Sequence, residues 1–265
     1  VLSLAGVAQS IIGDRATAAV GRTLHKAGLP QWTPAMPSAH YGKSYDIKPS
    51  EKKVVYFPSC INQTMGRSKQ GGLKLDLVDE MVQFLQKAGW EVIFPAGMKK
   101  LCCGMIWDSK GMPEIGMRKL RELEDALYEA SSNGRYPVMC DQSPCLARMR
   151  KNITKMKLYE PVEFIYDYVA DFLEFTQTDE PIAVHITCST RKMGLGEKLI
   201  SLAKKCSTKV IVPEEIGCCG FAGDKGFTHP EVNSYALRKL KPQLEAAGVK
   251  RGFSNSRTCE IGLST

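Results

Sequence analysis

Residues 92–104 are VIFPAGMKKLCCG, and residues 210–220 are VIVPEEIGCCG. Each stretch begins with a short apolar run rich in β-branched residues, which is typical of a strand. Each run is closed by a proline, and a cysteine pair followed by glycine comes next. The sequence therefore predicts two strands, each followed by a loop that carries adjacent cysteines.

Two further matches show that a longer unit is repeated. Residues 54–60 resemble residues 182–188, and residues 136–145 resemble residues 250–259. All four are strand-like runs that end on a cysteine. The offsets between the copies are 128 (188 − 60), 116 (218 − 102) and 114 (259 − 145). The copies therefore differ mainly in a first loop that is longer in copy one.

Stretches with helical spacing lie between these strands. Before residues 92–104, apolar residues recur at intervals of three or four, and Ala88-Gly89 marks a helix end; the apolar positions are Leu73, Leu77, Met81, Phe84 and Leu85. Further helices are expected at residues 114–131, 162–175, 195–206 and 231–247. Alternating strands and helices favour parallel sheets with right-handed crossovers. We expect an α/β fold of two pseudo-symmetric βαβαβ repeats.

The repeated cysteines all follow the carboxyl ends of predicted strands, which is where ligands bind in such sheets. Cysteines far apart in the sequence can therefore converge. The first expected group is Cys60, Cys102, Cys103 and Cys145, and the second is Cys188, Cys218, Cys219 and Cys259. The sequence predicts two sites of four thiols each, which we expect to bind a cofactor or metal.

The chain has 10 cysteines in 265 residues. In a reducing compartment, such cysteines are more often metal ligands or redox thiols than structural disulfides. Thiolates select iron–sulfur clusters, zinc or Cu(I). Structural zinc usually shows short Cys-x-x-Cys spacings, which the repeated cysteines lack. Adjacent cysteines can reach different iron atoms of a wider cluster, and the glycine lets backbone amides approach its sulfurs. We favour iron–sulfur clusters; zinc and thiol–disulfide exchange remain the alternatives.

Three other residues could in principle be further ligands, and each has a structural alternative. Cys140 follows a predicted strand and is either buried or an extra ligand of the first group. Cys206 has no counterpart in the other copy and is expected to be a core or surface thiol. His185 lies within a predicted strand and is expected to be a satisfied core or edge residue. Basic residues flank the cysteine loops and would offset the charge of thiolate-bound clusters: Lys99, Lys100, Arg148, Arg150, Lys151, Arg191 and Lys192.

The composition excludes several classes of protein. Hydrophobic residues make up 43% and charged residues 24%, which is ordinary globular composition rather than that of a disordered chain. The net charge of +8 suits an acidic partner or an anionic cofactor, but no nucleic-acid motif accompanies it. No apolar run approaches the roughly 20 residues of a transmembrane helix, and no basic region precedes the first apolar stretch as in a signal peptide. The expected location is the cytoplasm.

The doubled Cys-Cys-Gly, with one cysteine before and one after each pair, resembles the cysteine-rich CCG domain family. That family includes the cysteine-rich subunit of heterodisulfide reductase, the glycolate oxidase iron–sulfur subunit, and lactate-utilisation proteins. The ending at residues 254–263 looks most like the C-terminal region of FAD-linked D-lactate dehydrogenase-type oxidoreductases. The resemblance covers residues 53–265. We expect a connector at 1–52, a first CCG repeat at 53–178 and a second at 179–265.

The resemblance implies an electron-transfer role. By that likeness, the chain is an iron–sulfur fragment of an FAD-linked oxidoreductase acting on a 2-hydroxy acid such as D-lactate or glycolate. Its eight repeated cysteines would hold 4Fe-4S-type clusters. Flavin and ferredoxin-like domains of a parent chain would supply electrons. The acceptor would be a quinone, cytochrome or disulfide, through which the chain could associate peripherally with the inner membrane. The valine at residue 1 favours a fragment, which would lack the flavin site and substrate turnover.

The chain departs from the fullest family pattern at two positions. That pattern ends in Cys-x-x-Cys and resembles the five-thiolate site of heterodisulfide reductase. Here the earlier position of the pair is Gln142 in copy one and Ser256 in copy two. Cys140 could supply a fifth thiolate to the first site alone. Four-ligand clusters, or an asymmetric pair, are therefore expected.

Overall fold

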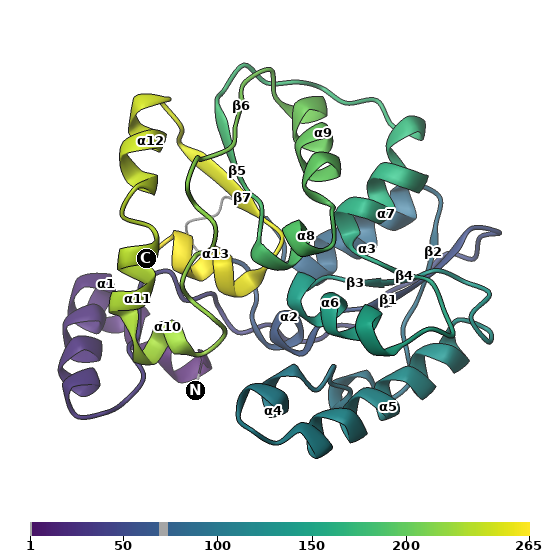
Figure 1. The fold of residues 1–265 in the computed structure, drawn as a ribbon, viewed down its shortest axis with the longest axis horizontal. Helices are drawn as coiled ribbons and strands as arrows, with labels where there is room; N and C mark the ends of the chain where they lie inside the picture. Colours follow the sequence, from purple (N-terminus) through teal and green to yellow (C-terminus); the bar gives the residue numbers. More distant parts are fainter. Residues whose placement is uncertain (1, 69–73) are drawn as a thin grey trace.

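A computed structural model describes residues 2–68 and 74–265, and the chain forms two parallel sheets with helices around them (Figure 1). The strand order is β2-β1-β3-β4 in the first sheet and β6-β5-β7 in the second. In both sheets, the strand that comes first in the sequence lies between the next two strands of the chain. The expected α/β fold with parallel strands is confirmed, and the two sheets share one strand order over three strands.

The first half is built around the four-stranded sheet. Its strands are β1 (Lys53–Phe57), β2 (Glu91–Ile93), β3 (Val138–Cys140) and β4 (Leu158–Tyr159). Its helices are α2 (Cys60–Thr64), α3 (Leu77–Lys87), α4 (Met105–Ser109), α5 (Pro113–Ala130), α6 (Ser143–Asn152) and α7 (Pro161–Tyr168). Two 3-10 turns, η1 (Met98–Lys100) and η2 (Ala170–Phe172), complete it. Strand β4 and helix α7 have no counterpart in the other half.

The second half is smaller. Its strands are β5 (Ile182–His185), β6 (Val210–Ile211) and β7 (Arg251–Ser254). Its helices are α8 (Cys188–Lys192), α9 (Gly196–Cys206), α10 (Lys225–Thr228), α11 (Pro230–Ala236), α12 (Leu240–Ala246) and α13 (Arg257–Leu263). The halves meet where α6 packs on α8 and α7 packs on α9.

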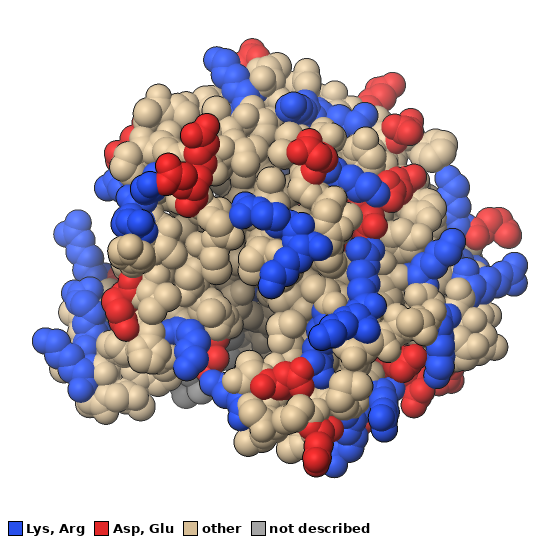
Figure 2. All heavy atoms as spheres, viewed as in Figure 1, with Lys and Arg blue, Asp and Glu red and all other residues tan. Residues whose placement is uncertain are grey.

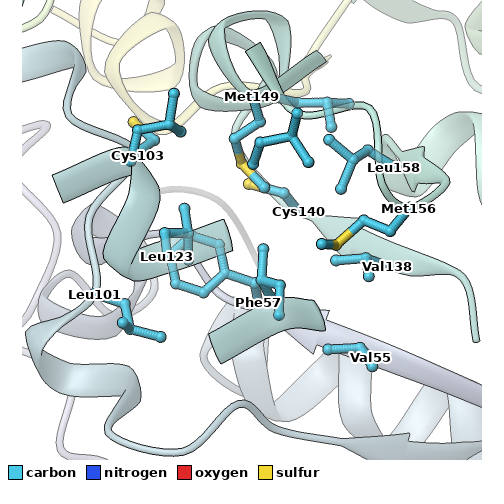
Figure 3. Close-up of a cluster of buried hydrophobic side chains, with 14 residues drawn as sticks. Val55, Phe57, Leu101, Cys103, Leu123, Val138, Cys140, Met149, Met156 and Leu158 are labelled. Carbon is cyan, nitrogen blue, oxygen red and sulfur yellow. The ribbon is translucent and has the colours of Figure 1, made fainter. Parts of the chain in front are cut away.

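Alternating side chains of β1 build the core on both faces of the first sheet. Val55 and Phe57 pack with α5 and α6 on one face (Figure 3). Val54 and Tyr56 pack with α3 and α7 on the other. All four side chains are buried because helices cover both faces, as parallel sheets require. The core thereby fixes the strand ends from which the cysteine loops emerge.

The N-terminal segment links the halves. It begins with α1 (Leu2–Lys26), which has a left-handed glycine at Gly13, and continues as an extended chain. The Gln31 amide donates to the Phe227 carbonyl of the second half at 2.6 Å. Farther on, Lys43 forms an ion pair with Asp79 of α3 in the first half. The proline-rich connector therefore wraps across both repeats.

Two helices expected from spacing are broken in the structure. The helix expected at residues 162–175 forms α7 and the 3-10 turn η2, which are separated at Val169. The spacing predicts a single helix over residues 231–247, but these residues form α11 and α12, separated by a turn. Pro242 explains the break, because its ring would clash with the carbonyl four residues earlier in a continuous helix. Leu73, an expected helix position, lies outside the described residues, and α3 begins at Leu77. No described helix has the length and apolar character needed to cross a bilayer.

Candidate metal or cofactor centres

The first four repeated cysteines are brought together from three loops. Cys60 is the first residue of α2, after β1, and Cys145 lies in the first turn of α6, after β3. Cys102 and Cys103 lie between η1 and α4, after β2. Cys60 interacts electrostatically with Cys102, Cys102 with Cys103, and Cys103 with Cys145. The four thiols therefore form a continuous row.

The row is electrostatically polarised around Cys102. Thiols of Cys103 and Cys60 donate hydrogen bonds to this sulfur, and these bonds lower the pKa of Cys102 strongly. The amide of Gly104 also donates to its Sγ at 3.3 Å, and the charge of Lys119 acts in the same direction. The same bonds, together with burial, raise the pKa values of Cys60 and Cys103. One thiolate is thus stabilised by its neighbours.

The second four cysteines are gathered in the same manner. Cys188 is the first residue of α8, and Cys259 lies in the first turn of α13. The Sγ atoms of Cys219 and Cys259 are 3.2 Å apart, and a side-chain hydrogen bond joins Cys218 to Cys188. The charge of Cys188 also raises the pKa of Cys259. The two pairs are therefore neighbours in one group.

Cys219 holds the thiolate of the second group. Its pKa is lowered to about 6, mainly because of the hydrogen bond between its sulfur and that of Cys259. Hydrogen bonds from the backbone of Phe221 and Ala222 add to this effect. The pKa of Cys259 is raised by the same bond and by burial. Cys219 and Cys259 are buried, whereas Cys188 and Cys218 are exposed.

The glycine after each cysteine pair has the same structural role in both halves. Gly104 and Gly220 have φ of 82° and 72°, which glycine adopts without strain. Each directs its amide at the first sulfur of its pair, and the Gly220 distance to Cys218 Sγ is 3.4 Å. A Cβ on Gly104 would overlap the carbonyl oxygen of Gly116, and one on Gly220 would lie 2.7 Å from that of Val232. Helix α5, which contains Gly116, and helix α11, which contains Val232, therefore pack directly against the two cysteine loops.

A side chain fixes the backbone of the second cysteine in each pair. Arg148 Nε donates to the Cys103 carbonyl at 2.7 Å, and Asn233 Nδ2 donates to the Cys219 carbonyl at 2.6 Å. Asn233 and Lys119 were not singled out from the sequence. Both residues lie within helices, and nothing in the sequence around them indicates that they face the cysteine loops.

Comparison with known proteins identifies the second half. Residues 182–264 match the family model of the cysteine-rich CCG domain. This segment is therefore similar to CCG domains. The chain is also similar to lactate utilization protein A 1 from Bacillus mycoides (strain KBAB4), with 22% identity over 199 residues. That match covers 69% of this chain and 80% of the relative. It therefore extends well beyond residues 182–264.

The two remaining cysteines, Cys140 and Cys206, lie outside the two thiol groups. Cys140 is fully buried among Val138, Met149 and Leu158 (Figure 3), and burial raises its pKa. Its sulfur accepts a hydrogen bond from the backbone of Gln142, and the charge of nearby Cys145 also acts on it. A ligand role for Cys140 stays a prediction. Cys206 is exposed on α9.

The two positions where the chain departs from the fullest CCG pattern face each other. Gln142 Nε2 donates to Ser256 Oγ at 3.0 Å, and both side chains are buried. These residues are related by the repeat offset of 114 (256 − 142). Equivalent positions of the two repeats therefore contact each other directly. Gln142 and Ser256 join the halves in this chain.

Basic residues lie near the cysteine loops in different ways. Arg191 reaches the carbonyl oxygens of Ile216 and Gly217, just before the second cysteine pair, at 3.5 Å each. Arg150 instead forms an ion pair with Glu163 on α7. Figure 2 shows Lys and Arg side chains around a hollow between the halves, with α4 and α10 at its edge in Figure 1.

His185 is buried in β5, the central strand of the second sheet. Its Nδ1 lies 3.1 Å from Ser254 Oγ. Burial, with a smaller contribution from Arg191, lowers its pKa to about 4. His185 occupies the expected core position within β5, but among the described residues its buried Nε2 has no hydrogen-bond partner, so the expectation of a satisfied side chain is wrong.

Across the described residues, no three or more His, Cys, Asp or Glu side chains are arranged to hold a metal ion. The thiols of each group interact electrostatically as neighbours, and Cys219 and Cys259 lie in contact. Their chemistry nevertheless suits iron–sulfur clusters, because each row offers four soft donors and glycine amides directed at sulfur. The assignment of these cysteines as ligands remains a prediction.

Proposed function

We propose that residues 53–265 act as an iron–sulfur electron-transfer unit of an oxidoreductase, with one 4Fe-4S-type cluster for each group of four cysteines. The observation that carries this proposal is the gathering of four thiols from three loops in each half. The similarity of residues 182–264 to CCG domains and the similarity to a lactate utilization protein support it.

The residues around each thiol group would hold and insulate a cluster. Eight thiolates would supply the ligands: Cys60, Cys102, Cys103, Cys145, Cys188, Cys218, Cys219 and Cys259. Amides of Gly104 and Gly220 would donate to ligand sulfurs, which is one way that proteins tune cluster potential. When bound, the clusters would supply one-electron transfer. Arg148 and Asn233 would fix the loop backbone and so the ligand positions.

Burial in each group differs from one cysteine to the next. Cys103, Cys219 and Cys259 are buried, whereas Cys60, Cys188 and Cys218 are exposed. A cluster at either position would be shielded on one side and accessible on the other. Such partial exposure suits electron exchange with a partner that docks at the surface.

The proposal also covers the source of the electrons and their acceptor. In an FAD-linked 2-hydroxy acid oxidoreductase acting on a compound such as D-lactate or glycolate, flavin and ferredoxin-like domains would supply electrons to this region. A quinone, cytochrome or disulfide would accept them. The cofactor supplies the chemistry, and the protein supplies binding and orientation. We expect the chain of residues 1–265 alone to purify without FAD and to leave D-lactate unoxidised with a dye acceptor.

The decisive test is metal and sulfide content. The protein would be purified anaerobically, reconstituted, and assayed for iron, zinc and acid-labile sulfide, with EPR of the reduced form. Cys102→Ser and Cys218→Ser should each remove about four iron and four sulfide per chain. Cys206→Ser is the matched control, because Cys206 is exposed and lies in neither thiol row; it should keep the full content.

The outcomes separate the proposal from its main rival. Stoichiometric zinc without sulfide would make the thiol groups structural zinc sites, and the electron-transfer proposal would fail. Equal loss of iron from the Cys206→Ser control would show that iron binds adventitiously. Loss of both clusters on either single substitution would contradict the separation into two groups.

A thiol–disulfide redox domain is the second candidate function. The contact that favours it is the hydrogen-bonded pair Cys219 and Cys259, whose sulfurs are 3.2 Å apart and where the pKa of Cys219 is lowered to about 6. A thiolate of this kind can attack a disulfide. Burial of both residues opposes it. Turnover of a small disulfide by metal-free protein, lost in Cys219→Ser, would support this candidate over clusters.

A further inference from the structure

A cavity of about 400 Å³ opens beside the loop that leads into the first cysteine pair. One wall comes from the N-terminal connector, and the other comes from the chain that follows β2 through η1. The apolar lining consists of Tyr45, Phe94, Pro95 and Met98. Both segments lie outside the thiol rows, so the proposed clusters do not use this cavity.

The apolar walls suit a flat ring. The rings of Tyr45 and Phe94 are stacked, with centroids 5.5 Å apart and an angle of 27° between planes. Phe94 also contacts the buried ring of Tyr56 at 5.9 Å. Aromatic rings stack on such surfaces in offset or edge-on geometry. Stacking covers the facing sides of the Tyr45 and Phe94 rings, so a planar aromatic ligand would stack on the aromatic surface that remains open to the cavity.

The charged part of the lining is entirely basic. Lys43, Lys99 and Lys100 contribute to the cavity, and none of its lining residues is acidic. Lys43 is paired with Asp79 at 2.6 Å. Within the described ranges, Lys99 and Lys100 are exposed and form no ion pair, so their charges are available to a ligand. An anionic group at the mouth of the cavity would be stabilised by them.

The cavity is already formed in the structure. Asp79 is 3% exposed and accepts hydrogen bonds from both Lys43 Nζ and Tyr45 OH, at 2.6 and 2.7 Å. It thereby fastens the connector wall to α3. On the other wall, Gly97 has a φ of 64° and begins the η1 turn. A ligand would meet fixed walls and would not have to order a loop, which favours binding.

We propose that this cavity binds a planar aromatic compound that carries an anionic group. The stacked rings would take the planar part, and Lys99 and Lys100 would take the anion. Only Leu101 separates Lys100 from Cys102, and Met98 packs against the core cluster that contains Cys103. A redox-active member of this class would therefore lie beside the first thiol group. That last consequence rests on the proposed electron-transfer function, whereas the binding does not.

The binding test uses calorimetric titration of the chain with naphthalene-2-sulfonate. We expect one site per chain, weaker binding of uncharged naphthalene-2-methanol, and weaker binding of the saturated cyclohexanesulfonate. Amide shifts in a labelled sample should be centred on residues 94–100. The same titration on metal-free and reconstituted protein keeps this result separate from the cluster assay. No binding by folded protein, or equal binding of all three probes, would overturn the proposal.

The lysines give a matched pair of variants. Lys99→Gln with Lys100→Gln should weaken naphthalene-2-sulfonate binding about tenfold, because two charge contacts of modest strength are lost. Lys204→Gln with Lys250→Gln removes two exposed charges of the second half and should leave the affinity unchanged. Equal weakening by both pairs would show that only net charge matters and would contradict a site.

Flavin mononucleotide serves as a second probe, because its ring and anion are joined through a flexible chain. Competition between this compound and naphthalene-2-sulfonate would show that the cavity accepts nucleotides whose aromatic ring system stacks on its walls. Binding of the sulfonate alone would assign it to small aromatic acids. Either result supports the proposal and identifies the source of the ligand.

Discussion

Gly104 and Gly220 show how single residues decide the geometry of the cysteine loops. Each has a positive φ, directs its amide at the preceding cysteine sulfur, and lies against a helix carbonyl twelve residues later (116 − 104 and 232 − 220). The sequence suggested that glycine lets backbone approach sulfur. It did not indicate the second constraint, contact with the following helix, because that depends on the tertiary position of α5 and α11.

Replacing Gly104 by alanine should destabilise the protein more than a positive φ alone requires. Gly111 is the matched control, since its φ is 77° and no atom lies within 4 Å of a Cβ built there. Gly111→Ala should cost about 1 kcal/mol. Gly104→Ala adds overlap with the Gly116 carbonyl and should cost about 3 kcal/mol or more. Urea unfolding of both variants measures the difference; equal losses would show that the loop moves freely away from α5.

Asn233→Ala tests the support of the second cysteine group. The substitution removes the side-chain donor to the Cys219 carbonyl, and a lost hydrogen bond to a buried group costs about 1–3 kcal/mol. We expect the second group to lose iron first on chelator challenge, while the first group keeps its iron. Arg148→Ala should produce the reverse order, because Arg148 holds the Cys103 carbonyl. Identical chelation profiles for the two variants would contradict these roles.

At the scale of elements, the strands of the repeat were predicted but their order in the sheets was not, and several helix ends follow from local signals. Helix α3 ends beside Ala88 and Gly89 as expected. The break between α11 and α12 and the extra strand β4 were not predicted. Hydrophobic spacing does not reveal a break, although Pro242 was an available signal. Strand β4 has only two residues, Leu158 and Tyr159, and depends on pairing with β3.

Helix α7 is joined to the other half through its N-terminus. Glu160 caps the helix by accepting from the Val162 amide at 3.1 Å, and it also accepts from Asn255 of the second half. The carboxyl is fully buried, and burial raises its pKa from 4.5 to about 7. The folded protein therefore holds a proton on Glu160 in a pH range where the unfolded chain does not.

This shift predicts a pH-dependent effect of Glu160→Gln. Because the folded pKa is the higher one, the contribution of Glu160 to stability is present below about pH 4.5 and is lost as the pH rises to about 7. Glutamine keeps the acceptor and does not titrate. The free energy of unfolding of the variant, relative to the original protein, should rise between pH 5 and pH 8. Urea unfolding at both pH values measures it, and a constant difference would show that Glu160 titrates normally.

At the scale of the whole molecule, the sequence repeat indicates two thiol groups and one fold pattern. It does not indicate how the halves meet. Gln142 and Ser256, at equivalent positions of the two repeats, contact each other, and Arg257 donates to Asn62 of the first half at 3.1 Å. The connector also contributes, since Ala35 packs with Cys219 and Cys259. Such contacts join residues distant in sequence, so no local pattern predicts them.

Arg257 and Lys110 both link the halves, and their different burial predicts different costs of removal. The Arg257 side chain is 2% exposed, donates to Asn62 and is paired with Glu260. Lys110 forms an ion pair with Asp224 across the halves at 2.6 Å, but both side chains are nearly half exposed. Removing one partner of a buried pair costs about 3–5 kcal/mol, whereas an exposed pair contributes about 0–1 kcal/mol.

Arg257→Gln should therefore lower the free energy of unfolding by about 3 kcal/mol, and Lys110→Gln by less than about 1 kcal/mol. Because Arg257 contacts both halves, its loss should shift the whole urea transition and leave it a single step. Fluorescence and far-ultraviolet circular dichroism, recorded on both variants, would monitor this. A separate early transition in Arg257→Gln would show that the halves unfold independently, and equal effects of the two variants would mean that the buried contact does not join them.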